Sequence, residues 1–189
     1  MTTNNSANIP NVESGAGTTF QSVAIQTASN SPNIVFGNLS SAYIMYMLVF
    51  GGISPAVDTD TLYMYMSQDN GATYLGAGAY VTSGTYVANN NSSNAPAQFH
   101  DGSNQNQIWL SQPIPTGGYV HGTLNIFGAN QAVQMQVGFN TFHVGVSPTF
   151  LYTNINAMGA AGNTVNAIKF QMSTGNILSG TFGLYGILA

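Results

Sequence analysis

The segment TVNAIKFQMSTGNILSGTFGLYGIL, from Thr164 to Leu188, contains two β-strand patterns joined by a turn sequence. In the first pattern, Thr164 to Met172, apolar side chains share one face and Lys169 and Gln171 share the other, which is typical of a half-buried strand. The second pattern, Thr181 to Leu188, is apolar on both faces. The glycines and the asparagine of the intervening STGNILSG can take the left-handed backbone conformations of a tight connection. The segment therefore predicts a closing hairpin that is part of the core.

Strand patterns of the same kind recur along the rest of the chain. The most apolar of them, Ser41 to Phe50, has apolar residues on both faces, which predicts either a central strand of one sheet in a two-layer packing or a strand whose outer face contacts another subunit. No helix-period segment is longer than a turn or two. We expect an all-β fold, an antiparallel β-sandwich of jelly-roll-like type with about nine or ten strands. Besides the closing segment, the expected strands cover residues 18–27, 41–50, 61–67, 73–82, 107–111, 119–127, 132–144 and 149–152.

The length of 189 residues favours one folded unit, which we place at residues 17–189. Residues 1–16 are polar and aperiodic, which predicts a flexible N-terminal arm. Such an arm either frays or orders against a neighbouring subunit. Residues 83–106 form the least regular interior segment, and an internal loop of that length is usually functional or mobile.

Charged residues are scarce: the chain contains one lysine, no arginine and five acidic residues. A typical domain has about 25% charged residues, whereas this chain has 3%. Nucleic-acid binding is therefore not expected, because gripping phosphates requires several basic side chains. A neutral polar surface also lacks the charge that keeps proteins apart. We expect a homo-oligomer, with a trimer as one option, or a subunit of a larger assembly.

No segment predicts membrane insertion. The longest apolar run, Tyr43 to Phe50, is far shorter than the roughly 20 residues of a spanning helix. The N-terminus lacks the basic start and the apolar stretch of a signal peptide. Cysteine is absent, so disulfides and cysteine ligands are absent with it.

Motifs for catalysis or metal binding are weak. Asp58 and Asp60 could bind a hard cation, but no further carboxylate lies nearby in the sequence, and turn-forming side chains are the simpler interpretation. His100, His121 and His143 have no zinc-site spacing. Glycosidases use a pair of carboxylates, and the sequence does not indicate such a pair among the five acidic residues of this chain. We expect no enzyme activity, no metal and no cofactor.

The sequence SQDNGATY, from Ser67 to Tyr74, matches an Asp-box, in which the aspartate orders a turn through local hydrogen bonds. Its Asn-Gly pair predicts a hairpin tip.

Aromatic residues could contact a ligand or a partner. Trp109 and the ten tyrosines are suited to stacking on sugars, but Tyr and Trp are also enriched in protein interfaces, which is the interpretation we favour. The candidate ligand or partner contacts are Trp109, Tyr119, His100 and Asp101.

The segments SQDNGATY and GNILSGTFGLYGIL resemble a group of virion proteins of tailed phages and prophages. Members of the group share a tyrosine-rich strand, an "S-x-D-G-G-x-x-Y" hairpin and an ending "G-N-I-x-S-G-x-F-x-L-Y-G-I". The resemblance covers roughly residues 41–82 and 164–189. Asn70 stands where many members have glycine, and an Asn-Gly turn tolerates that change.

The resemblance implies a β-sandwich on a particle surface, made in the cytoplasm of the bacterial host. It supplies no catalytic residues. We expect a capsid decoration (cement) protein whose partners are other copies of itself and the major capsid protein or another virion protein. The alternative is a receptor-binding head or tail fibre or a spike domain, in which residues 83–106 and Trp109 contact a host glycan. A third class, a glycan hydrolase, would require acidic residues as catalysts.

Overall fold

The computed structural model describes residues 20–89, 96–98, 102–144, 150–159 and 164–188, which form β-strands and connections without a helix. The expected arm, 1–16, lies outside these residues. The described residues contain thirteen strands: β1 Phe20–Ser31, β2 Ile34–Phe36, β3 Tyr43–Pro55, β4 Leu62–Ser67, β5 Tyr80–Asn89, β6 Pro96–Gln98, β7 Gly102–Gln105, β8 Ile108–Trp109, β9 Val120–Phe127, β10 Gln136–Val144, β11 Phe150–Gly159, β12 Ala167–Met172 and β13 Ile177–Leu188. No helix in the described part of the chain could span a membrane.

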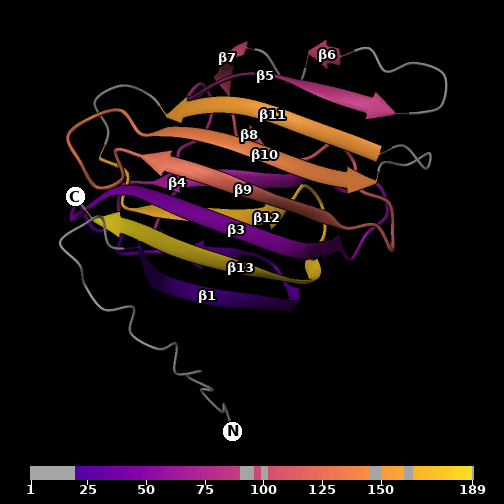
Figure 1. The fold of residues 1–189 in the computed structure, drawn as a ribbon, viewed down its shortest axis with the longest axis horizontal. Coiled ribbons are helices and arrows are strands. Elements are labelled where there is room, and N and C mark those ends of the chain that lie inside the picture. The colour runs from indigo at the N-terminus through magenta and orange to yellow at the C-terminus, as the bar shows by residue number, and fades with distance from the viewer. Residues whose placement is uncertain (1–19, 90–95, 99–101, 145–149, 160–163, 189) are drawn as a thin grey trace, which may run out of the picture.

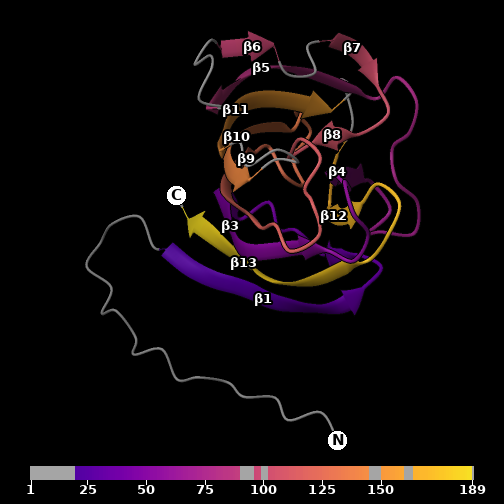
Figure 2. The ribbon, with the colours of Figure 1, turned by 90° about the vertical axis from the view of Figure 1, so that its right-hand side faces the viewer.

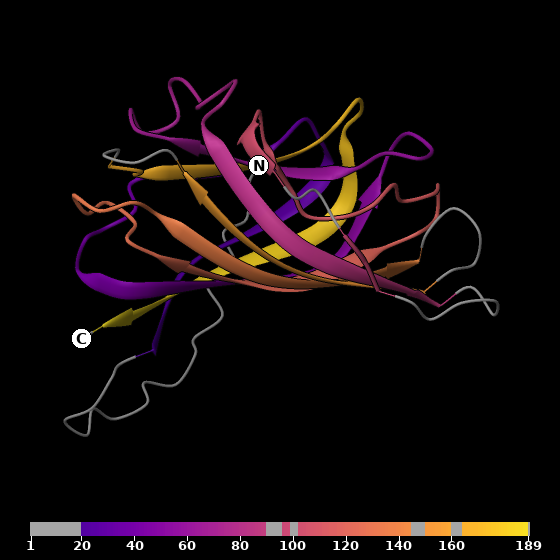
Figure 3. The same ribbon diagram turned by 90° about the horizontal axis from the view of Figure 1, so that it is seen from above.

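The strands form two antiparallel sheets that pack face to face (Figures 1 and 2). The large sheet has nine strands in the order β1-β13-β3-β9-β10-β11-β5-β6, with β7 also paired to β5. The small sheet has the order β2-β12-β4-β8. Strands of the large sheet curve along their length (Figure 3). The expected class, an antiparallel, jelly-roll-like β-sandwich, is confirmed. The strand count exceeds the expected nine or ten because β2, β6, β7 and β8 are only two to four residues long.

The core lies between the two sheets. Strand β12 buries its apolar side chains and leaves Lys169 and Gln171 on the outside, as the sequence predicts. Strand β3 lies between β13 and β9, which confirms its central position. Aromatic rings pack across the two layers. The ring centroid of Phe170 in β12 lies 5.1 Å from that of Phe182 in β13.

The expected closing hairpin is wrong, because β12 pairs in the small sheet and β13 pairs in the large sheet. The connection between them is held by a buried carboxylate. Asp60 accepts hydrogen bonds from the backbone N–H of Thr174 at 3.1 Å and of Gly175 at 2.9 Å, and from the Ser173 hydroxyl. These bonds satisfy the turn's amides and direct the chain from one layer to the other, so β13 does not fold back onto β12.

The second expected hairpin, after the Asp-box, is also not formed. Asn70 and Gly71 have φ of +59° and +91°, so the predicted Asn-Gly turn is present. The next strand begins only at Tyr80, however, and β5 belongs to the large sheet. The Tyr80 hydroxyl donates to the carbonyl of Leu75 and accepts from the N–H of Met66, which anchors the crossing chain to the end of β4.

The sequence predicts a long loop over residues 83–106, and the structure corrects this for the residues that it describes, since 90–95 and 99–101 lie outside them. Strand β5 continues to Asn89, and β6 and β7 pair with it at the edge of the large sheet. The sequence did not predict these strands because their composition is polar, and a strand at a sheet edge needs no alternation of apolar residues.

Candidate functional site

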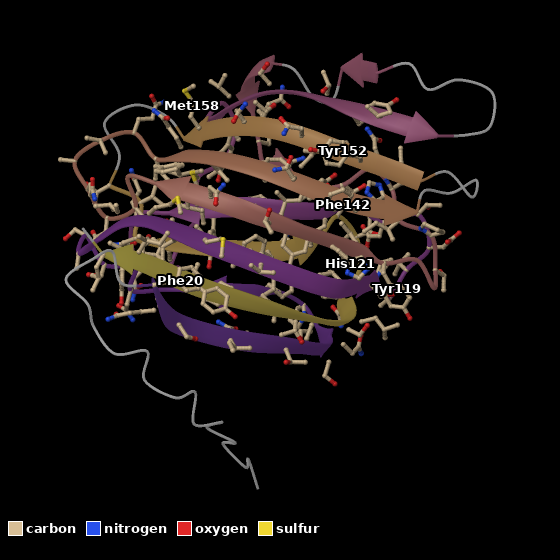
Figure 4. The ribbon with its side chains drawn as sticks, in the orientation of Figure 1. Phe20, Tyr119, His121, Phe142, Tyr152 and Met158 are labelled. Carbon is tan, nitrogen blue, oxygen red and sulfur yellow. The ribbon has the colours of Figure 1, made fainter. Side chains whose placement is uncertain are left out.

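The candidate functional site is the face of the large sheet that points away from the small sheet, here called the open face. Seven neighbouring strands, from β1 to β5 in the sheet order, contribute to it. Figure 4 views this face directly, with Phe20 of β1, Phe142 of β10, and Tyr152 and Met158 of β11 pointing outward. No other layer covers it among the described residues.

The strand register aligns the outward side chains of β9, β10, β11 and β5 in four rows. The two outer rows are mainly apolar: Phe127, Gln136, Met158 and Val81 on one side, and His121, Phe142, Tyr152 and Val87 on the other. The two middle rows carry amides and hydroxyls: Asn125, Gly138, Asn156 and Ser83, then Thr123, Asn140, Asn154 and Thr85. The open face therefore has a polar, uncharged centre between two apolar margins.

Strands β3, β13 and β1 extend the same rows toward the other edge of the sheet. Met45, Met47 and Val49 of β3 face outward beside β9. Beyond them the ring of Tyr185 stacks on that of Phe20, with centroids 5.0 Å apart and an interplanar angle of 12°. Phe20 is nevertheless 51% exposed. Large aromatic surface left in water at a sheet edge is typical of a contact region.

Polar side chains at the centre are held in fixed orientations. The carboxamide oxygen of Asn140 accepts hydrogen bonds from the Tyr152 hydroxyl at 2.8 Å and from the Asn154 amide at 2.7 Å. The Tyr152 ring also packs on Phe142, with centroids 5.0 Å apart. These contacts pre-order the surface, so docking a partner would immobilise few additional side chains.

No charged side chain of the described residues lies on the open face. Asp58 and Asp60 are in the connection after β3, Asp69 is in the Asp-box turn, and Lys169 is on the small sheet. A protein partner could therefore cover the open face without desolvating an ion, which is the most costly step in closing an interface.

A groove borders one end of the open face. Its lining includes Gly118. It also includes Tyr119, His121 and Phe142, which are labelled in Figure 4. Tyr119 immediately precedes β9 and is 49% exposed. The His121 Nδ1 atom accepts a hydrogen bond from the Gly52 N–H at 3.1 Å, which holds the ring against β3.

His143 lies beneath the same groove, on the inner side of β10, and is 2% exposed. Neither ring nitrogen has a hydrogen-bond partner in the described part of the chain. Burial lowers the pKa of His143 to about 4. Its ring is therefore neutral at physiological pH and contributes to packing.

We expect this burial to make the fold sensitive to acid. Because the pKa of His143 is about 4 when folded and about 6.5 when unfolded, only the unfolded chain takes up the proton as pH falls from 6.5 toward 4. The free energy of unfolding should fall by up to about 3 kcal/mol across that window. Urea unfolding at pH 7 and pH 4.5 measures it. His143→Gln should remove most of the drop, and an unchanged drop in this variant would contradict the assignment.

The structure separates the predicted contact residues. Trp109 is on β8 of the small sheet, whereas Tyr119 borders the open face of the large sheet. His100 and Asp101 lie outside the described residues. The sequence did not identify Phe142 and Tyr152 as residues of the open face. The only signal for their outward position was that they alternate with buried neighbours along their strands.

Asp60 and Asp69 have structural roles. Asp60 is 1% exposed. Burial alone would raise the pKa of Asp60, but hydrogen bonds led by that from Ser173 outweigh burial and hold the pKa below its usual value. Asp69 accepts from the hydroxyl and N–H of Thr73 and from the Ser67 hydroxyl, which lowers the pKa of Asp69 to about 2. The turn-forming interpretation of the Asp-box is confirmed, and no described group of His, Asp and Glu could hold a metal.

Comparisons with known proteins do not assign the chain to a family. No protein-family model matches the sequence, and no curated protein sequence matches it significantly. Two solved structures are weakly similar. One is CG-16, a homodimeric agglutinin from chicken liver, with 16% identity, coverage of 74% of this chain and 99% of that chain, and a TM-score of 0.26. The other is galectin-Ib from Xenopus laevis, with 14% identity, the same coverage and a TM-score of 0.24. Scores this low carry no argument about this chain.

Proposed function

We propose that the chain is a non-enzymatic structural protein of a bacteriophage virion, a capsid decoration protein whose open face packs against neighbouring copies. The observation that carries the proposal is a wide, pre-ordered sheet face without a charged side chain, in a chain with six charged residues in total. The resemblance of SQDNGATY and GNILSGTFGLYGIL to phage virion proteins supplies the biological setting.

The dimensions of the open face suit a stable contact. Seven strands spaced about 4.8 Å apart and four rows spaced about 6.7 Å apart give roughly 600–900 Å². A standard interface buries about 800 Å² on each partner. The open face can therefore supply one complete interface per subunit.

The proposed mechanism is uncharged contact between copies that sit on the capsid lattice. The apolar margins, which contain Phe127, Met158 and Phe142, provide the buried area, and the central Asn and Thr side chains provide hydrogen bonds that fix the register. Because no ion pairs contribute, binding should depend little on salt.

A receptor-binding fibre or spike domain is the second candidate function. Trp109 supports it, because this residue lies on the outer face of the small sheet, beside Tyr63. That surface remains available when the open face is covered.

The location of the protein in purified particles tests the proposal. We expect hundreds of copies per particle by quantitative mass spectrometry, and labelling over the shell with antibodies in electron micrographs. Retention on particles washed at high salt should match that at low salt. A few copies at the tail would favour the fibre, and absence from particles would overturn both functions.

A further inference from the structure

The outer face of the small sheet carries a second surface, on the other side of the molecule from the open face. Its side chains come from neighbouring strands in two adjacent rows. Lys169 of β12 is paired with Tyr65 of β4, and in the next row Tyr63 lies between Gln171 of β12 and Trp109 of β8. With Tyr74, which packs beside Tyr65, these six residues form what we call the aromatic platform.

The rings of the aromatic platform touch one another and remain partly exposed. The centroid of Tyr63 lies 5.3 Å from that of Trp109 and 6.5 Å from that of Tyr65. All six residues are half-buried. A partly exposed row of aromatic rings is suited to stacking on the apolar face of a sugar. The Gln171 amide beside the rings donates only a long hydrogen bond, 3.5 Å, to the Tyr65 hydroxyl.

Lys169 distinguishes this platform from ordinary aromatic packing. It is the only lysine or arginine in the chain. Its Nζ atom lies 4.1 Å from the centroid of the Tyr74 ring and 4.5 Å from that of Tyr65. Partial burial lowers the pKa of Lys169. The described carboxylates form no ion pair with it, and the neighbouring Asp69 is engaged in its own turn.

A partly desolvated cation without an anion partner is well placed to receive one from a ligand. The rings near Nζ stabilise the charge but cannot accept a full ionic hydrogen bond. Adjacent rows on a strand are about 6.7 Å apart. A sugar ring on Trp109 and Tyr63 would therefore bring a substituent of the same residue, or of the next one, to Lys169.

We propose that the aromatic platform binds a saccharide that carries a carboxylate, with a sugar ring stacked on Trp109 and Tyr63 and the carboxylate paired with Lys169. Gln171 would exchange its long hydrogen bond to the Tyr65 hydroxyl for bonds to the sugar hydroxyls between these two contacts. The proposal does not depend on the assembly function, because the platform and the open face are on different sheets.

Trp109 is the only tryptophan in the chain, so tryptophan fluorescence reports binding at the aromatic platform. Fluorescence titration of the full chain would compare sialyllactose with lactose, and trigalacturonate with maltotriose. In at least one pair we expect the acidic saccharide to shift Trp109 emission and to bind about five- to tenfold more tightly than its neutral partner, a preference that high salt removes. Failure of all four saccharides to bind would overturn the proposal.

Two variants separate the contributions, with binding measured by calorimetry. Lys169→Gln should abolish the acidic preference and retain weak neutral binding, whereas Trp109→Ala should abolish both. Val133→Ser, at an exposed bend between β9 and β10 outside both surfaces, is the control and should bind as the unmodified chain does. Far-ultraviolet circular dichroism checks that each variant is folded. An unchanged preference in Lys169→Gln, or equal affinity for acetate and the acidic saccharides, would contradict the platform.

Discussion

Replacing Phe182 with alanine should lower the free energy of unfolding by about 3–5 kcal/mol, the usual cost of removing a buried phenylalanine ring. Phe182 is 0% exposed and lies in a stack of aromatic rings, 5.1 Å from Phe170 of the small sheet and 5.8 Å from Phe50 of the large sheet. The substitution would leave a cavity where the two layers meet. Many domains have a total stability of about 5–15 kcal/mol, so this loss would be a large fraction of it.

Urea unfolding followed by circular dichroism measures the loss, and Leu178→Ala is the matched control. Leu178 is on the same strand but is 47% exposed. Its replacement should change the free energy of unfolding by about 0.5 kcal/mol or less. Equal effects of the two substitutions would show that the sheets do not pack through Phe182.

Placing a lysine at the centre of the open face should prevent assembly. Thr123 is exposed on β9 and has uncharged neighbours in its row, so Thr123→Lys should fold normally as an isolated chain. In an assembled contact the new ammonium would be buried without a partner, at a cost of about 3–5 kcal/mol. Self-association should weaken more than a hundredfold.

Analytical ultracentrifugation over a range of concentrations measures this effect. Ala77→Lys, at an exposed turn outside both sheets, adds the same charge and should leave self-association unchanged. If the two lysines weaken association equally, net charge would be responsible and the open face would not be the contact.

Alternation in the sequence predicted which side chains are buried, as in β12, where Lys169 and Gln171 stay outside. It did not predict which strands pair. Strands β12 and β13 look like a hairpin in sequence, yet they pair in different sheets, and Asp60 binds the turn between them from a distant part of the chain. A hydrogen bond between residues more than a hundred positions apart leaves no local signal.

The candidate site was likewise predicted only in part from the sequence. The scarcity of charge predicted an uncharged surface, and Trp109 was identified as a contact residue from its type alone. The open face itself depends on sheet order, since Phe142 and Tyr152 become neighbours only through the register of β10 and β11. Trp109 likewise meets Tyr63 only because β8 pairs with β4. Such pairings are set by packing between distant segments.

Sedimentation velocity of the unmodified protein at about 0.05 M and about 1 M salt tests the central claim most directly, because the two conditions differ about fourfold or more in screening length. We predict an oligomer of the same size and affinity in both, with amides of β9 and β10 in the open face protected from hydrogen exchange relative to Thr123→Lys. A monomer at every concentration, or an oligomer that dissociates at high salt, would contradict assembly through an uncharged open face.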